Sequence, residues 1–373
     1  MATSTFYGWA EPDNSSLVKN GASDIRTLGD AIDTSVWNVG FGQAGKNKII
    51  NGDFSVNQRN FTSTTTSADY NLDRWRTVYT GGTSTTSAQV FTPGTAPVAG
   101  YEGKNYYRVA ITGQSAVTDF VRVQEEMESV RTLAGQTATI SFWAKASTGT
   151  PKIAVNMVQT FGTGGSPSAS VDVLSGTVTT STAWARYSLT VAIPSISGKT
   201  FGTANDDRLS LRMMLSGGSS VAAAQSIGLQ NVTFELWGVQ VEYGSKATPF
   251  QTASGGSPQA ELAMCQRYYW RTNNPSAYAL HGTGLARSTT EGQFLITHPV
   301  SMRIAPTSID FSTIAVTNAI ALNSAVTGTA LSQASSQTAS VYTSGSSGLT
   351  ADRVYFLANN NSTSGYVGFS AEL

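Results

Sequence analysis

The 373-residue sequence predicts a mainly β protein, with tandem β-sandwich domains behind a short N-terminal helical or coiled-coil assembly segment. Charged residues make up only 12% of the chain, against about a quarter in ordinary soluble domains. Serine, threonine, glycine and asparagine carry the polarity instead, and they suit strand surfaces and turns better than solvated helix faces. Several short segments also alternate apolar and polar residues with a period of two, which indicates half-buried strands.

Charge and cysteine content exclude several classes of protein. The 23 basic and 23 acidic residues balance to zero, so the chain lacks the basic footprint of a nucleic-acid-binding protein. The one cysteine, Cys265, allows neither a disulfide within the chain nor a cysteine-based zinc site, and we interpret it as a small buried apolar residue. No segment has the apolar core of a signal peptide or the roughly 18 apolar residues that span a membrane. We therefore expect synthesis in a cytoplasm and no membrane insertion.

Residues 1–46 are predicted to form a docking and oligomerisation segment. Phe6, Tyr7 and Trp9 lie in an irregular stretch, where exposed aromatic rings are unfavourable unless another surface covers them. These rings form a docking peptide or pack back on their own chain, and the sequence leaves both interpretations open.

A helix is predicted directly after this stretch, over residues 15–39. Its apolar residues recur at a spacing typical of a short coiled-coil seam: they are Val18, Ile25, Leu28, Ile32 and Val39. Gly21 and Ser35 fall on the other core positions and weaken the seam. Because so short a helix is marginal alone in water, it needs its own copies or a neighbouring protein. The alternative is a single amphipathic helix lying on the following domain.

Residues 47–252 are predicted to form the first β-sandwich. In the segment ATISFWAKA, Ile140, Phe142 and Ala144 point to one face, while Trp143 and Lys145 point to the other. Three further stripes have the same spacing: Ile153, Val155, Met157; Tyr187, Leu189, Val191, Ile193; and Leu209, Leu211, Met213, Leu215. In the segment VTFELWGVQVEY the pattern slips by one residue at Gly238, which predicts a β-bulge.

Residues 253–373 are predicted to form a C-terminal β-sandwich with a short leading helix. The glycine- and serine-rich residues 253–257 suggest a linker, and residues 258–267 a helix with Pro258 near its start. Alternating strands with long serine- and threonine-rich loops follow. The low-complexity run 323–347 is interpreted either as surface loops or as strands with little core.

Three passages, taken together, resemble a module known from other proteins. They are KIINGDFSVNQRN with YNLDRW, TISFWAKAS with TAWARYSLTVAIP, and FELWGVQVEYGSKATPFQ with ELAMCQRYY. In this order they resemble a jelly-roll module that is widespread in phage and prophage tail proteins and is similar to carbohydrate-binding modules. The opening FYGWAEPDNSSLVKNGASDIRTLGDAIDTS resembles the N-terminal segment of phage tail proteins, and PVSMRIAPTSIDF with YVGFSAEL resembles their C-terminal domain.

The resemblance implies a bacteriophage virion protein, made in the host cytoplasm and located in the tail. It implies a homotrimeric tail fibre whose N-terminus attaches to a tail or baseplate protein and whose β domains contact a host-surface glycan or protein. A head decoration or capsid-surface protein with the same jelly roll is the alternative. A glycan-degrading tail enzyme is a third hypothesis.

No catalytic constellation stands out, so we expect no enzymatic activity. Glu125, Glu126 and Glu128 cluster, and Asp206 adjoins Asp207. Neighbours on a strand face opposite ways, so neither set makes a facing carboxylate pair, and we interpret both as solvated surface. The sequence also lacks a G-x-S-x-G elbow and His-x-x-x-His spacing.

Glycan binding would use exposed aromatic rings as stacking platforms beside polar side chains. The candidate rings are Trp75, Trp143, Trp184 and Tyr107. Trp143 is the most interesting, because it lies opposite the Ile140 and Phe142 face. A sandwich core also needs large aromatic residues, so core packing is the alternative for each ring.

No cofactor is expected apart from one metal. The resemblance to carbohydrate-binding jelly rolls implies a structural calcium near the first and last strands. Asn51, Asp53, Gln240 and Glu242 occupy comparable positions and offer the hard oxygen ligands that calcium takes. Asn-Gly-Asp is also a good turn on its own, which is the alternative interpretation.

Overall fold

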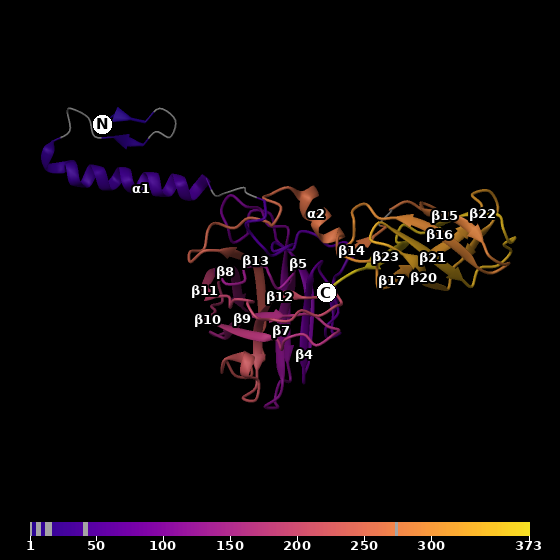
Figure 1. The fold of residues 1–373 in the computed structure, drawn as a ribbon, viewed down its shortest axis with the longest axis horizontal. Coiled ribbons are helices and arrows are strands. Elements are labelled where there is room, and N and C mark those ends of the chain that lie inside the picture. Colours follow the sequence, from indigo (N-terminus) through magenta and orange to yellow (C-terminus); the bar gives the residue numbers. More distant parts are fainter. Residues whose placement is uncertain (1, 5–8, 12–16, 40–43, 273–274) are drawn as a thin grey trace.

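The computed structural model describes residues 2–4, 9–11, 17–39, 44–272 and 275–373, with the side chains of residues 33–39 left out. A small hairpin of β1 (Ala2–Thr3) and β2 (Ala10–Glu11) lies beside helix α1 (Gly21–Val39), which follows the 3₁₀ turn η1 (Val18–Asn20). Figure 1 shows this helix extending away from the strand-rich parts of the chain. None of the helices in the described ranges has the length and apolar character needed to cross a bilayer.

The first sandwich is a jelly roll made of two antiparallel sheets. The five-stranded sheet has the order β10 (Val171–Thr179), β9 (Lys152–Thr160), β12 (Arg208–Gly217), β7 (Phe120–Glu128) and β4 (Trp75–Thr80). The six-stranded sheet has the order β11 (Ala185–Ala192), β8 (Thr137–Ala146), β13 (Thr233–Tyr243), β6 (Asn105–Thr112), β5 (Thr83–Val90) and β3 (Ser63–Thr64). Neighbouring strands come from distant parts of the sequence, so each sheet face combines residues that the sequence keeps apart.

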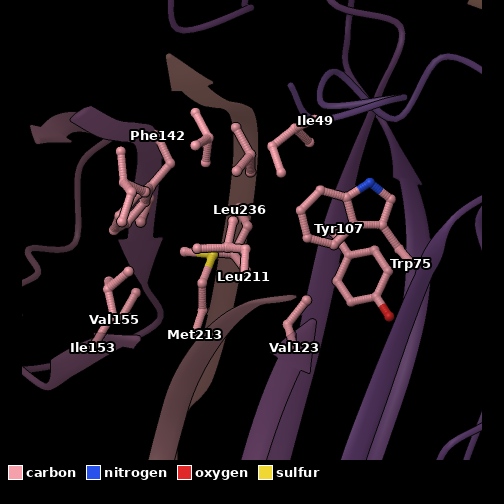
Figure 2. Packing of buried hydrophobic residues seen from close by; sticks show 14 of the residues in the cluster. Ile49, Trp75, Tyr107, Val123, Phe142, Ile153, Val155, Leu211, Met213 and Leu236 are labelled. Atoms are coloured by element: carbon pink, nitrogen blue, oxygen red, sulfur yellow. The ribbon is translucent and has the colours of Figure 1, made fainter. Parts of the chain in front are cut away.

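The core of the jelly roll lies between the inner faces of the two sheets. Figure 2 shows side chains from both sheets meeting there. Ile140, Phe142 and Ala144 of β8 are fully buried, as are Leu211 and Met213 of β12. The residues of the predicted stripes belong to this core, with the partly buried Tyr187 and Leu189 packed against it, so the sequence-based prediction of the inward faces is confirmed.

The predicted bulge is present in β13. The register with β8 shifts between Trp237 and Gln240, and Gly238 has a φ of 61°. A Cβ at this position would lie 2.8 Å from a ring atom of Trp143, so only glycine fits both the backbone and the space. The bulge keeps Trp237 and Gln240 on the same outer face of the sheet, opposite Trp143 and Ser141 of β8.

The second sandwich follows α2 (Pro258–Gln266), whose N-cap Ser257 accepts a hydrogen bond from the Ala260 amide. Its seven-stranded sheet has the order β19 (Asn323–Ala325), β18 (Ile314–Thr317), β22 (Val354–Asn359), β15 (Leu280–Ala286), β16 (Gly292–Thr297), β21 (Thr338–Ser344) and β20 (Gly328–Ala334). A three-stranded sheet has the order β14 (Tyr269–Arg271), β23 (Tyr366–Ser370) and β17 (Ser308–Ser312). The run 323–347 therefore contains strands, and Ala339 and Val341 of β21 are buried in the core. The predicted boundaries at 46/47 and 252/253 stay a prediction.

The carboxylates of β7 correct one prediction. Glu125 and Glu126 are 0% and 1% exposed, so they are not solvated surface. Glu125 takes an inward position on β7, opposite Trp75 of β4, where the neighbouring chain excludes water. Glu126 points outward, but Arg76 and Arg208 cover it at 2.9 and 3.4 Å. Strand alternation correctly predicted that Glu126 points outward. Glu126 is nevertheless buried, because the covering arginines come from two other strands, β4 and β12.

Arg74 connects the two sandwiches through a buried polar network. It is fully buried, donates to Glu372, and has the ring of Tyr268 only 3.5 Å from its guanidinium carbon. Glu125 Oε1 lies 3.7 Å from Arg74 Nε, and neither of its oxygens has a hydrogen-bond partner among the described residues. Arg59 approaches Glu372 at 3.4 Å. These five residues are called the polar junction below.

Candidate functional site

The outer face of the six-stranded sheet carries the candidate site. Strand register places Arg186 of β11 opposite Trp143 of β8, which in turn lies opposite Trp237 of β13. One step along, Lys145 of β8 lies opposite Glu235 of β13. The outward positions of three strands therefore form rows of aromatic and charged side chains.

Trp143 and Trp237 are covered by loops. They are 8% and 0% exposed. Their ring centroids are 5.4 Å apart, and the rings of Phe250 and Tyr101 pack on Trp237 at 5.0 and 5.3 Å. The guanidinium carbon of Arg186 lies 4.6 Å from the Trp143 ring centre. Trp143 therefore does lie on the outward face, as predicted, but its ring packs in a small outer core and does not offer a free surface.

Trp184 and Tyr106 extend this aromatic cluster to the solvent. Both rings are partly exposed, and their centroids lie 5.7 Å apart at an interplanar angle of 84°. The buried ring of Phe91 supports them at 5.8 and 4.7 Å. Because the rings are held by a buried neighbour, their positions are set before any ligand arrives.

Charged side chains border these two rings. Glu235 accepts a 2.8 Å hydrogen bond from Arg108 Nε and lies 2.8 Å from Lys145 Nζ. Lys145 Nζ lies 5.3 Å from the Trp184 ring centre. The side chains of Arg108 and Lys145 are 36% and 30% exposed, whereas Glu235 is only 8% exposed. Both cations thus present donors to the solvent while one buried carboxylate fixes them.

Trp184, Tyr106, Arg108, Lys145 and Glu235 are called the aromatic platform below. Rings with polar groups at their edges match the chemistry of a sugar ring, which has apolar C–H faces and a rim of hydroxyls. Sequence reasoning identified Trp184 but missed Tyr106 and the ionic groups. Period two did place Lys145 on the face of Trp143. The pairing of β8, β13 and β6 that brings the charges together cannot be read from local spacing.

Trp75 and Tyr107 are corrected to core residues. Both are 0% exposed, with ring centroids 6.4 Å apart, and the Phe54 ring packs against each of them. Trp75 Nε1 donates to the Asn51 carbonyl, and the Tyr107 hydroxyl donates to Asn71 Oδ1 at 2.9 Å. Their polar atoms are satisfied inside the sandwich, so neither ring is available to a glycan.

The four oxygen donors expected to hold calcium are already engaged with protein donors. Asp53 accepts from Ser55 and from the Tyr101 hydroxyl. Glu242 accepts from the amide and hydroxyl of Thr248, and from the Gln240 amide group. These carboxylates are held in place by protein donors, and the calcium site stays a prediction.

Asn51 and Gln240 are engaged in the same way. The Asn51 side chain bridges Val56 and the Asp73 carbonyl, and Gln240 Oε1 accepts from the Gln251 amide. Within the described residues, no group of three or more His, Cys, Asp or Glu side chains is arranged to hold a metal.

The structure describes only some of the N-terminal residues that were predicted to act in docking and oligomerisation. Val18, Ile25 and Ile32 are 97%, 66% and 38% exposed, and Leu28 is partly buried. The side chain of Val39 and the residues Phe6 and Tyr7 lie outside the described part of the chain.

Trp9 belongs to the described part of the N-terminus and is partly buried. Its amide donates to the Ser4 hydroxyl, and its carbonyl accepts from the Ser4 amide. These contacts close the β1–β2 hairpin. They do not decide whether the N-terminal aromatic rings dock on another protein or pack on their own chain.

Comparison with known proteins finds no matching family model and no matching curated protein. Among solved structures, the enzymatically active domain of tailspike protein 4 of bacteriophage CBA120 is 12% identical, covers 53% of this chain and has a TM-score of 0.32. This chain spans only 22% of that chain's length. The family 11 carbohydrate-binding module from Clostridium thermocellum is 10% identical over 50% of this chain and 99% of its own, with a TM-score of 0.30. The N-terminal cellulose-binding domain of Cellulomonas fimi β-1,4-glucanase C is 15% identical over 43% and 90%, with a TM-score of 0.28. At identities of 10–15% and TM-scores of 0.28–0.32, these matches carry no argument about the ligand or the role of this chain.

Proposed function

We propose that this chain is a non-enzymatic tail fibre protein of a tailed bacteriophage, which acts as a homotrimer and contacts a host-surface glycan. In this role it is made in the host cytoplasm and becomes part of the virion tail. Its N-terminal segment attaches to a tail or baseplate protein. The sequence passages that resemble phage tail modules support this assignment.

The aromatic platform carries the glycan part of the proposal. It combines two partly exposed rings with two partly exposed cations that Glu235 holds in place. A pyranose ring stacks its C–H face on such a ring, and its hydroxyls accept hydrogen bonds from the neighbouring cations. This geometry supports binding, because Glu235 is ion-paired and holds both cations at the edge of the rings.

Helix α1 supports assembly with further copies of the chain. Ile25 and Ile32 lie seven residues apart on this helix, and Val18 continues the same spacing in η1 just before it. Val18 and Ile25 are largely exposed, and Ile32 is 38% exposed. Leaving such β-branched side chains in water is unfavourable, and a coiled-coil seam would bury them. A second copy fits best, because the stripe has the heptad period that identical helices share.

The test of glycan binding is a glycan array probed with the full chain and with single variants. Trp184→Ala removes the stacking ring, and Lys145→Met removes one bordering cation while keeping the side chain's apolar stem. Tyr243→Ala is the matched control, because Tyr243 is 68% exposed at the end of β13 and lies outside the platform.

We expect Trp184→Ala to lose binding by about tenfold or more, since one stacking contact contributes about 1–3 kcal/mol. Lys145→Met is expected to weaken binding less, and Tyr243→Ala to leave it unchanged. Equal binding by all four proteins would refute the platform as the glycan site. The melting temperature of each variant checks that the sandwich remains folded.

A further inference from the structure

The outer face of the five-stranded sheet carries a concentration of arginines. Gln124 of β7 lies opposite Arg212 of β12 on one side and opposite Arg76 of β4 on the other. Arg122 shares this face, two residues before Gln124. Arg208 lies four residues before Arg212 on β12 and therefore also points outward. Directly opposed side chains in a sheet begin about 5 Å apart, so these guanidinium groups share one surface.

Few carboxylates balance these arginines. Glu126 lies 2.9 Å from Arg76 and 3.4 Å from Arg208. Asp172 is 59% exposed and reaches only 4.0 Å from Arg212. Glu128 also lies opposite Arg208, but it pairs with Arg267 at 2.7 Å. Five arginines, with Arg267 included, against three carboxylates leave a local charge of +2 (5 − 3), in a chain whose formal net charge is zero. Arg76, Arg122, Arg208 and Arg212 are called the arginine face below.

Several donors on this face have no protein acceptor. Arg122 donates through Nε to Gln124 Oε1 at 2.6 Å, and among the described residues no hydrogen bond uses its terminal nitrogens. The terminal nitrogens of Arg212 have only the long contact to Asp172. The Nε atoms of Arg76 and Arg212 are buried and also lack hydrogen-bond partners in the described part of the chain.

The surroundings increase the mutual repulsion of these cations. The segment around η2 (Ala222–Ala224) packs on Met214, which lies directly opposite Arg122. This packing removes water beside Arg122, and burial together with the charge of Arg212 lowers the pKa of Arg122 to about 10. Burial also lowers the pKa of Arg212. A bound anion would relieve this strain, because it supplies the opposite charge and accepts hydrogen bonds from the terminal nitrogens of Arg122 and Arg212.

We propose that the arginine face binds the carboxylate groups of an acidic polysaccharide. A guanidinium fork matches the two oxygens of a carboxylate, and neighbouring arginines on adjacent strands form a site for one such group. A polysaccharide fits better than a nucleic acid, since a local charge of +2 is small beside the continuous phosphate contacts of nucleic-acid binders. The site is on the opposite sheet from the aromatic platform, so it stands independently of the proposed function.

Affinity electrophoresis of the full chain tests this proposal. Native gels contain polygalacturonate as the carboxylate polymer, dextran sulfate as the sulfate polymer, double-stranded DNA as the nucleic acid, or dextran as the neutral polymer. The test variant is Arg122→Gln/Arg212→Gln. The matched control is Arg287→Gln/Arg353→Gln, because both of these arginines are exposed in the second sandwich and their replacement removes the same charge.

We expect polygalacturonate to retard the wild type and the control, while dextran retards neither. The test variant should lose affinity by about tenfold for each arginine, as expected for a charge-assisted hydrogen bond. Its melting temperature should equal or exceed that of the wild type, because a repulsion has been removed. Arg122→Lys/Arg212→Lys keeps the charge without the fork, and it should retain part of the affinity.

Four outcomes with these gels would overturn the proposal. One is the absence of retardation by polygalacturonate, and a second is equal retardation of the test and control variants. A third is tighter binding to dextran sulfate than to polygalacturonate, which would assign a sulfate site. The fourth is stronger retardation by double-stranded DNA than by either polymer, which would assign a nucleic-acid site. Inorganic phosphate is then added to the polygalacturonate gel at the same charge concentration as the polymer. Unchanged retardation supports a site for the polymer, whereas loss of retardation would assign a site for the free anion and overturn the proposal.

Discussion

Glu125 is a fully buried carboxyl group in the polar junction, and its charge state links the stability of the jelly roll to pH. Burial raises the pKa of Glu125 from 4.5 to about 8, and the charge of Arg74 offsets only part of that rise. The native state therefore keeps a proton that the unfolded chain releases. The stability that depends on this proton is fully present below pH 4.5 and is lost as the pH rises through about 8.

The size of the effect follows from the two pKa values of Glu125. Each unit of difference corresponds to about 1.4 kcal/mol, so a change from 4.5 to about 8 amounts to at most about 5 kcal/mol. Glu125→Gln has nearly the same shape as the protonated acid and cannot ionise. We expect this variant to match the wild type near pH 4.5 and to exceed it in unfolding free energy by up to that amount above pH 8.

Urea unfolding, followed by tryptophan fluorescence at several pH values, measures this difference. Trp75 reports on the same region, because it lies opposite Glu125 in the sheet. Asp69→Asn is the control, since Asp69 is exposed and its replacement also removes one carboxylate. Parallel stability curves for the wild type and Glu125→Gln across this range would refute the reasoning. They would mean that the native protein does not hold a proton on Glu125.

Three further predictions concern the junction, the thiol and assembly. Glu372→Gln removes the charge partner of buried Arg74 and should lower the unfolding free energy by about 3–5 kcal/mol; a loss below about 1 kcal/mol would contradict this role. Burial raises the pKa of the Cys265 thiol, so a disulfide reagent should modify it only in denaturant, and rapid reaction of the native protein would contradict its burial. By light scattering, the full chain should have three times the 39.2 kDa mass of one chain, and a truncation beginning at Lys48 should be monomeric. A trimer in both would place the contacts in the sandwiches.

Local sequence patterns predicted the strands and their inward faces well. The stripe of Ile140, Phe142 and Ala144 lies in the core, and Gly238 marks the bulge in β13. These features follow from steric rules that act over a few residues: side chains alternate along a strand, and a positive φ next to a tryptophan ring requires glycine.

The same patterns failed where burial depends on a distant part of the chain. Trp75 and Trp143 both lie in strands of the jelly roll, yet Trp75 lies between the sheets and Trp143 lies under loops on the outside. Glu126 takes an outward position on its strand and is nevertheless buried, because Arg76 and Arg208 cover it. No local rule indicates which outward positions stay exposed.

The sequence by itself therefore determined the fold class, the inward stripes and the heptad spacing of Val18, Ile25 and Ile32. Only the tertiary structure decided which outward side chains come together. Lys145 meets Glu235, and Arg212 meets Gln124, because strand order pairs segments that are far apart in the chain. Two surfaces result from that pairing, the aromatic platform on one sheet and the arginine face on the other. Hydrophobic periodicity sets which side of a strand faces the core, whereas the chemistry of the outer surface depends on which strands become neighbours.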